Sequence, residues 1–214
     1  MDPVLDKSLK HKKRLSTLKN LRWQKDLIEL YRHGLSSKEI SDKIGFSENK
    51  INYWLGKLKI SKRSISEAIY LKNNPNGDPF KIKTNLNPQE YKLLGMGLGL
   101  YWGEGGKRGK YIRLSNSDPK LIRKFLEFLI KICQINQDKL KFWLQIFDDT
   151  NPQEALNFWC QELNIKSNKF FKTTITPSRG HGTYKNKCRF GVLTVHFGNI
   201  KLKEQLLSML EYKS

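Results

Sequence analysis

Glycines at four-residue intervals most constrain how this chain can fold. Gly95, Gly99 and Gly103 lie in a largely apolar run that is followed by the carboxylate of Glu104. If the run is helical, residues four apart share one face, so these glycines form a stripe without side chains. Each glycine costs a helix interior about 0.8–1 kcal/mol relative to alanine. The spacing therefore predicts that another helix packs closely against the stripe.

The sequence also marks the two ends of this helix. Asn87 can cap the first turn, Pro88 suits the first helical position, and Glu90 can complete a reciprocal capping box. The Gly105-Gly106 pair should stop the helix just after Glu104. The helix dipole disfavours a carboxylate at this end unless a cation or a metal meets it. We therefore interpret Glu104 as a functional residue.

Other structures compete for the same segment. A membrane span needs about 20 apolar residues, whereas this run is short and bounded by Lys92 and Glu104. A phosphate-binding loop requires Ser or Thr after its Gly-Lys pair, but Arg108 follows Lys107 here. The remaining alternative is a buried glycine-rich helix with an incidental surface glutamate.

The residues from Leu98 to Gly105 resemble the end of the LAGLIDADG motif of homing endonucleases. The following residues are also similar to that family: a basic turn at 107–110, a strand near 111–115, and a helix that opens at 116–119. Gly97 and Trp102 depart from the usual pattern, and so does Glu104, although glutamate keeps the carboxylate. The resemblance covers about residues 88–214.

This resemblance implies a four-stranded antiparallel, saddle-shaped sheet backed by helices, whose concave face lies along the DNA major groove. The chain has one copy of the motif, and single-motif members of the family act as homodimers, so each chain would bring one Glu104 to a shared centre. Adjacent carboxylates repel unless divalent ions bridge them, and hard oxygen ligands suit Mg²⁺. We expect the metal at Glu104 and Gly103. The expected dimer interface comprises Gly95, Leu98, Gly99 and Trp102.

The same resemblance suggests further catalytic residues. Family members often carry a polar side chain, frequently glutamine, in the second strand, and Gln145 stands at the matching position. They also often carry a cation at the end of the last strand, where His196 is the candidate and Lys187 the alternative. A histidine packed within a strand is the competing interpretation of position 196.

Charge indicates a polyanionic partner. The chain has 40 Lys plus Arg against 20 Asp plus Glu, a formal net charge of +20, and such an excess is typical of proteins that bind nucleic acid. The basic residues from Lys7 to Lys25 form either a DNA-contacting arm or a solvated tail. Cys133, Cys160 and Cys188 lack metal or redox spacing, and no signal peptide or membrane run is evident. We expect an intracellular protein, in the cytoplasm or nucleoid, without a membrane partner.

The pattern of residues 21–69 resembles a small all-α helix-turn-helix DNA-binding domain. Ser36 with Glu39 predicts a capping box for a short helix that ends at Gly45, and Ser47 can cap the next helix. A plain three-helix bundle with a polar surface is the alternative. On the last helix, the outward side chains suited to contact DNA are those of Asn49, Lys50, Tyr53 and Lys57.

The chain is thus expected to comprise a basic N-terminal arm (1–20), the helix-turn-helix domain, a linker rich in turn residues (70–87) and the endonuclease domain (88–214). After the glycine helix, the last domain should follow an α+β order. We expect strands at 111–115, 142–147, 169–176 and 189–197, and helices at 119–134, 152–163 and 200–210. In the first strand, Ile112 and Leu114 alternate with Tyr111, Arg113 and Ser115, which predicts one apolar face and one face with polar and cationic side chains. Further DNA contacts are expected from Lys107, Arg108, Arg113, Lys172, Arg179, Lys185 and Arg189.

Together these features predict a metal-dependent, site-specific double-strand DNA endonuclease (a homing-type hydrolase) that works as a homodimer. A DNA-binding transcriptional regulator that keeps the scaffold without cutting is one alternative. An RNA-binding splicing factor is another, because a basic saddle can also take structured RNA. The carboxylate of Glu104 favours cleavage, since a non-cleaving scaffold would not need an acid against the helix dipole.

Overall fold

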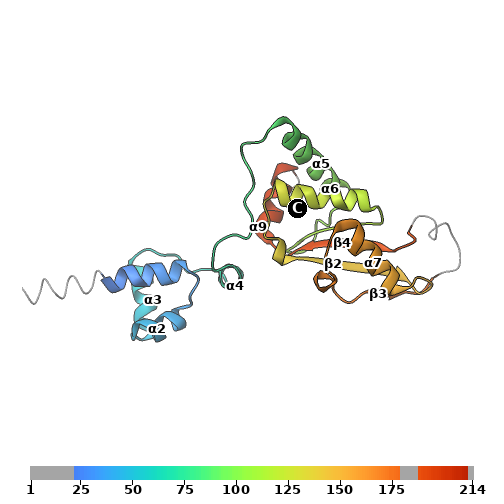
Figure 1. Cartoon of the computed structure of the whole chain (residues 1–214). Coiled ribbons are helices and arrows are strands. Elements are labelled where there is room, and N and C mark those ends of the chain that lie inside the picture. The colour runs from blue at the N-terminus through green and yellow to red at the C-terminus, as the bar shows by residue number, and fades with distance from the viewer. Residues whose placement is uncertain (1–21, 179–187, 212–214) are drawn as a thin grey trace, which may run out of the picture. The chain divides into compact units, whose positions relative to one another are not determined.

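The computed structural model describes residues 22–178 and 188–211. The chain divides into two compact units, Met1–Asp78 and Pro79–Ser214 (Figure 1). Within the described ranges, no helix is both long enough and apolar enough to cross a membrane.

The first unit consists of short helices around a small core. Residues 22–32 are helical, and α2 (Ser37–Ile44), α3 (Glu48–Lys57) and α4 (Ile65–Asn73) follow. The predicted capping box forms at the start of α2, where the Ser36 hydroxyl accepts from the Glu39 N–H and the Glu39 carboxylate accepts from the Ser36 N–H. The helices predicted after the caps Ser36 and Ser47 are confirmed, whereas α4 was not predicted. Their use as a helix-turn-helix stays a prediction.

A left-handed glycine makes the tight turn between α2 and α3 possible. Gly45 has a φ of 76°, a conformation that glycine adopts without steric cost. Ser47, two residues later, caps α3 by accepting from the Lys50 N–H. Ile40 of α2 and Ile51 of α3 are both fully buried in the core of this unit, so the turn brings these two short helices onto one core.

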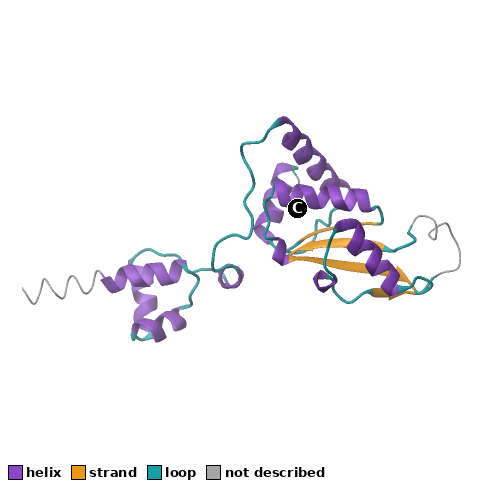
Figure 2. Ribbon diagram, viewed as in Figure 1, coloured by secondary structure: helices purple, strands orange, loops and turns teal. Residues whose placement is uncertain are grey.

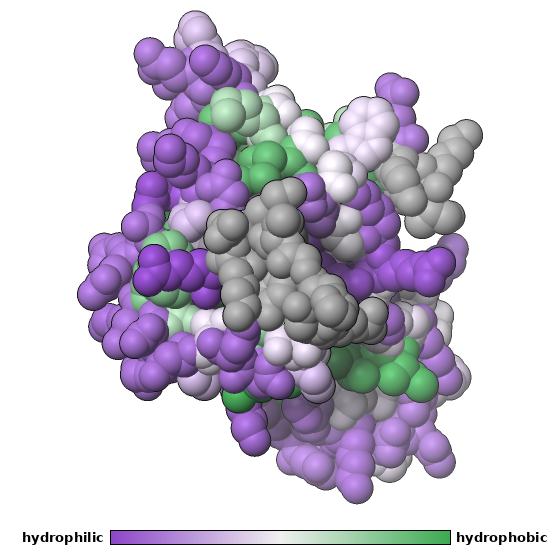
Figure 3. Space-filling view, turned by 90° about the vertical axis from the view of Figure 1, so that its right-hand side faces the viewer, coloured by the Kyte–Doolittle hydropathy of each residue, from purple (hydrophilic) through white to green (hydrophobic). Residues whose placement is uncertain are grey.

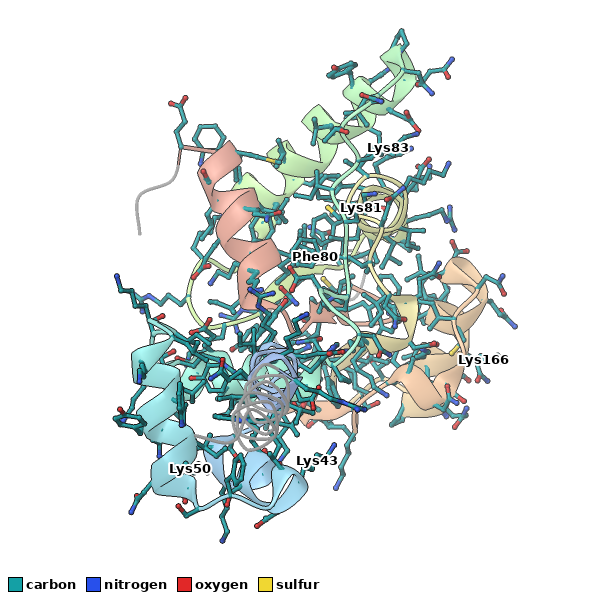
Figure 4. All side chains as sticks on the ribbon, turned by 90° about the vertical axis from the view of Figure 1, so that its left-hand side faces the viewer. Lys43, Lys50, Phe80, Lys81, Lys83 and Lys166 are labelled. Atoms are coloured by element: carbon teal, nitrogen blue, oxygen red, sulfur yellow. The ribbon has the colours of Figure 1, made fainter. Side chains whose placement is uncertain are left out.

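The second unit begins before the expected end of the linker. From Pro79 onward the chain runs beside the end of α6 (Pro119–Lys131): the N–H groups of Lys81 and Lys83 donate to the carbonyls of Cys133 and Ile132. Figure 4 labels Phe80, Lys81 and Lys83 along this segment. Residues 70–87 therefore contain the end of α4 and a strap that belongs to the second unit.

The glycine helix is α5 (Pro88–Glu104), with the predicted bounds. The Glu90 N–H donates to Asn87 at 2.9 Å, and the Glu90 carboxylate accepts from the Asn87 N–H at 3.0 Å and from Lys83 at 2.6 Å. These contacts explain why the pKa of Glu90 lies below its usual value, chiefly through the Lys83 hydrogen bond. The reciprocal cap thus fixes where the helix begins.

Helix packing within the chain uses a glycine outside the predicted stripe. Gly97 is buried against α6, and a Cβ at this position would collide with the ring of Phe128. A Cβ at Gly95, Gly99 or Gly103 would meet nothing within 4 Å. The stripe is therefore uncovered, and close approach of α5 to α6 depends on Gly97.

The sheet has four strands: β1 (Ile112–Asn116), β2 (Leu140–Phe147), β3 (Thr174–Thr176) and β4 (Val192–Phe197) (Figure 2). Their order is β1-β4-β2-β3, with β4 antiparallel to both of its neighbours. The prediction of a wholly antiparallel sheet was wrong, because β3 pairs with β2 in parallel. The α+β class is confirmed.

Several element bounds differ from those expected. Of the expected strand 169–176, only the last three residues form β3. Residues 167–169 form a 3₁₀ turn instead, and Phe170 makes a single bridge to β2 rather than a ladder. β4 starts at Val192 instead of residue 189, and α6 ends at Lys131 instead of residue 134. Helices α7 (Pro152–Leu163) and α9 (Ile200–Met209) lie where they were predicted, within one residue.

One face of the sheet carries the core. Alternate strand residues such as Leu114, Phe142 and Val195 are buried against the helices, together with Trp159 of α7 and Leu206 of α9. Strand side chains alternate between faces, so the neighbouring positions lie on the opposite side of the sheet. Figure 3 shows a largely hydrophilic surface with separate apolar patches.

Candidate nucleic-acid interface

The face of the sheet opposite the core is polar and aromatic. Arg113 of β1 lies opposite His196 of β4, which lies opposite Lys141 of β2. One step along, Thr194 of β4 lies between a serine of β1 and Trp143 of β2. The alternation predicted for the first strand is confirmed, and it puts cations and hydroxyls on this open face.

A groove of about 660 Å³ runs along this open face. It brings together four of the residues predicted from the sequence, namely Arg113, Gln145, Lys172 and His196. The sequence reasoning assigned no role to the other lining residues, although aromatic residues at the polar positions of an alternating strand were the available signal. These others are Tyr111, Ser115, Trp143, Phe171 and Thr194. No carboxylate lines the groove among the residues the structure describes, which suits an anionic ligand.

Contacts within the groove hold its side chains in place. The Ser115 and Thr194 hydroxyls are 2.8 Å apart, and the Trp143 indole N–H donates to the Thr174 hydroxyl at 2.7 Å. The His196 ring packs near two aromatic rings, with its centre 4.8 Å from that of Tyr111 and 6.0 Å from that of Phe171.

His196 is not well suited to act as a cation. Burial lowers the pKa of its imidazole, and the nearby positive charge of Arg113 lowers it further. Both effects disfavour the protonated ring. We therefore expect a neutral histidine at neutral pH, which serves as a packed ring and a hydrogen-bonding group.

The acid at the end of α5 has a cation beside it. Glu104 is exposed, and the Lys107 ammonium donates to the carbonyl of Tyr101 at 2.9 Å and to that of Trp102. Burial lowers the pKa of Lys107, while the charge of Glu104 acts in the opposite direction. Lys107, expected as a DNA contact, thus satisfies the last carbonyls of α5 and offsets the helix dipole near Glu104.

Glycines join the end of α5 to the edge of the sheet. Gly105 forms an isolated bridge with Leu114, and the Gly106 N–H donates to the Arg113 carbonyl at 2.9 Å. A Cβ on Gly106 would collide with the Arg113 side chain. The Tyr101 hydroxyl donates to the Gly106 carbonyl, and burial raises the pKa of Tyr101 to about 12, so this donor stays protonated. The carboxylate-bearing end is therefore fixed to β1.

A buried lysine anchors the loop after α5. Lys203 of α9 is only 3% exposed, and its ammonium donates to the carbonyls of Lys107 and Gly109 at 2.5 and 2.7 Å. Burial lowers the pKa of Lys203, with a smaller contribution from Arg113. Sequence reasoning missed this residue, because a lysine in an amphipathic helix normally faces water.

The donors at Glu104 are of the right type for Mg²⁺, but one chain supplies few of them. Its carboxylate and the adjacent carbonyl of Gly103 are hard oxygen ligands. Across the described ranges, no three His, Cys, Asp or Glu side chains are grouped to hold a metal. A site of this kind would need a second carboxylate from another chain.

In the first unit, the predicted contact residues of α3 are all exposed. Tyr53 is 62% exposed. The Lys50 ammonium, labelled in Figure 4, lies 3.6 Å from the centre of the Phe46 ring, and that of Lys57 lies 4.8 Å from that of Trp54. Both lysines therefore rest on aromatic rings, and the Lys57 ammonium also lies 5.9 Å from the centre of the Tyr53 ring. Of the four predicted contact residues, Asn49 is the one for which the described residues show no such contact.

Other predicted residues stand apart from the groove or outside the described part of the chain. Arg108 and Arg189 are exposed, and Leu98 of the expected dimer interface is half-buried against the core while Trp102 is 59% exposed. The predicted contacts Arg179, Lys185 and Lys187 lie outside the described residues, as does the basic arm.

Comparison with family models, with curated proteins and with solved structures finds no match to this chain.

Proposed function

We propose that this protein is a site-specific DNA endonuclease that acts as a homodimer. The observation that carries the proposal is the open side of α5, where a glycine stripe without neighbours leads to the exposed Glu104. Exposed glycines cost helix stability and contribute no packing within the chain. A second α5 packed on this stripe would explain them, and twofold symmetry would bring a second Glu104 to the same centre.

The acid-free groove supports DNA as the ligand. Arg113 and Lys172 would bind phosphates, and Gln145 offers an amide that can both donate and accept hydrogen bonds. Lys107 would keep the end of α5 in place through its two carbonyl contacts. In the first unit, Asn49 and Tyr53 of α3 would add contacts to base edges or phosphates.

Paired Glu104 carboxylates, with the carbonyl of Gly103, would hold Mg²⁺. When bound, the metal would supply activation of water and stabilisation of the leaving oxygen in phosphodiester hydrolysis. Arg113 would position the scissile phosphate. It lies on β1 beside the end of α5, where Gly105 and Gly106, the two residues after Glu104, are bonded to β1.

One observation favours a second candidate, a DNA-binding regulator that does not cut. Because Lys107 already offsets the dipole at the end of α5, Glu104 does not require a metal for its stability. A scaffold that had lost cleavage could therefore keep this glutamate.

Selection from a random duplex library in Mg²⁺ separates these functions. The wild-type protein, Glu104→Gln, and the control Glu204→Gln, which alters an exposed acid of α9, are each incubated with the library, and the bound and cut molecules are sequenced. An endonuclease predicts cuts at a shared motif with wild type and control, but bound and uncut DNA with Glu104→Gln. A motif enriched without cutting by any variant would mean a regulator, and no enrichment would refute both and direct attention to RNA.

A further inference from the structure

The open face of the sheet exposes large aromatic rings inside a basic groove. Trp143 is 49% exposed and Phe171 is 47% exposed, and both line the groove with Tyr111 and His196. Single exposed aromatic residues are ordinary, but a cluster in a concave site indicates a ligand. Paired bases in a duplex offer only their edges, which are read mainly by polar and cationic groups, with the thymine methyl group as a small apolar contact. An intact duplex does not offer the flat face of a base, so it would cover these rings only in part.

We propose that this groove receives one unstacked base of the DNA that the sheet binds. The proposal rests on the proposed function, because the sheet must first hold the DNA. Every base has an apolar face that stacks on an aromatic ring, whatever its sequence. The indole of Trp143 is already oriented by its hydrogen bond to Thr174, so little side-chain entropy would be lost when a base stacks on it.

The register of the strands sets a spacing that suits a flat ring. Trp143 lies opposite Thr194, so His196, two residues further along β4, is its diagonal neighbour on the same face. Diagonal neighbours are separated by about 7–8 Å. A planar ring between two side chains needs about twice the contact distance of ~3.5–4.0 Å between carbon atoms. The spacing of these two strand positions is therefore close to what one stacked base requires, and the Phe171 ring, whose centre lies 6.0 Å from that of His196, borders the same part of the groove.

Polar groups of the groove match the rest of a nucleotide. Gln145 and the hydrogen-bonded pair Ser115 and Thr194 can donate to or accept from the edge of a base. Lys172 and Arg113 provide positive charge for the flanking phosphates. The same pocket therefore has an aromatic surface, adaptable hydrogen-bonding groups and cations, which a nucleotide with an extruded base requires together.

The test compares two DNA probes that differ only in base pairing. Binding of the full chain to a matched duplex and to the same duplex with a short central unpaired bubble is measured by fluorescence anisotropy at fixed salt. The wild-type protein should prefer the bubble. Trp143→Ala should weaken binding to the bubble by roughly 5- to 150-fold, with little change for the matched duplex, and Trp143→Phe should keep part of the preference.

The control is Ile175→Ala, which shortens an exposed apolar side chain of β3 on the opposite face of the sheet, next to buried Ile146. It should behave as wild type. Equal wild-type affinity for the two probes, or a bubble preference that survives Trp143→Ala, would overturn the base pocket while leaving duplex binding intact. Absence of binding to either DNA probe would instead remove the proposed function on which the pocket depends.

Discussion

Alanine at Gly97 and at Gly99 should change the stability of the second unit in different ways. Both residues lie within α5, so the gain in helix propensity is the same, about 0.8–1 kcal/mol. At Gly99 a new methyl group meets nothing within 4 Å, so the full gain should appear. At Gly97 the methyl group would collide with the Phe128 ring, and overpacking of a core typically costs about 1–3 kcal/mol.

Since the propensity contribution cancels, the difference between the two variants isolates the steric cost. We expect Gly97→Ala to be about 1–3 kcal/mol less stable than Gly99→Ala. The assay is urea denaturation of the full chain, followed by circular dichroism at a concentration where sedimentation shows monomers. If the two units unfold in separate transitions, the one that shifts in Gly97→Ala belongs to the second unit, because α5 is part of that unit. Equal shifts at the two positions would refute the assignment of Gly97 as the packing glycine.

A larger substitution at Gly99 tests the proposed dimer. A Cβ at the exposed Gly99 would meet nothing within 4 Å, so we expect Gly99→Leu to stay folded but to lose self-association. Sedimentation analysis of the wild type and of this variant measures that directly. A dimer with unchanged mass in the variant would contradict helix pairing through the stripe.

Three further results are expected. Lys203→Met should lower the free energy of unfolding by about 1–3 kcal/mol, because it leaves two loop carbonyls, including that of Gly109, without their buried donor; an unchanged urea midpoint would argue against this anchor. Burial and Arg113 lower the pKa of His196 in the folded chain. Near and below the ordinary histidine pKa of about 6.5, the unfolded chain therefore binds more protons than the folded chain, and the free energy of unfolding should fall as the pH drops through that region. Denaturation at pH 7.5 and 5.5 should show a smaller loss for His196→Gln than for wild type, and equal losses would refute this. Burial raises the pKa of Cys133 to about 12, so mass spectrometry after iodoacetamide treatment should find this thiol unmodified until the protein unfolds, whereas modification in the native state would contradict its burial.

Local signals in the sequence were sufficient to place most helices. The capping boxes at Ser36 and Asn87 depend on residues three apart, and both form as predicted. Strand alternation at Ile112 and Leu114 correctly identified the buried face. These features depend on neighbours along the chain, which is why a single sequence is enough to find them.

Features set by distant contacts were not predictable in this way. The parallel direction of β3 depends on the path of the chain between β2 and β3. The short length of β3 depends on how many residues of this segment form ladder hydrogen bonds with β2. The glycine pattern suggested a packed stripe, but the packing glycine is Gly97, which faces Phe128 of another helix. The roles of Lys107 and Lys203 depend on carbonyl groups that only the folded chain brings near them.

The central place of β4 in the sheet has a consequence for synthesis on the ribosome. Among the strands that the structure describes, β1 has β4 as its neighbour, and β4 separates β1 from β2. The Ser115–Thr194 hydroxyl pair spans 79 residues of chain, and contacts this distant in sequence form slowly. A nascent chain that ends before Val192 leaves β1 without a partner strand and the apolar side chains of β1 and β2 incompletely covered. Premature termination in this region should therefore yield a product prone to aggregation rather than a partly active fragment.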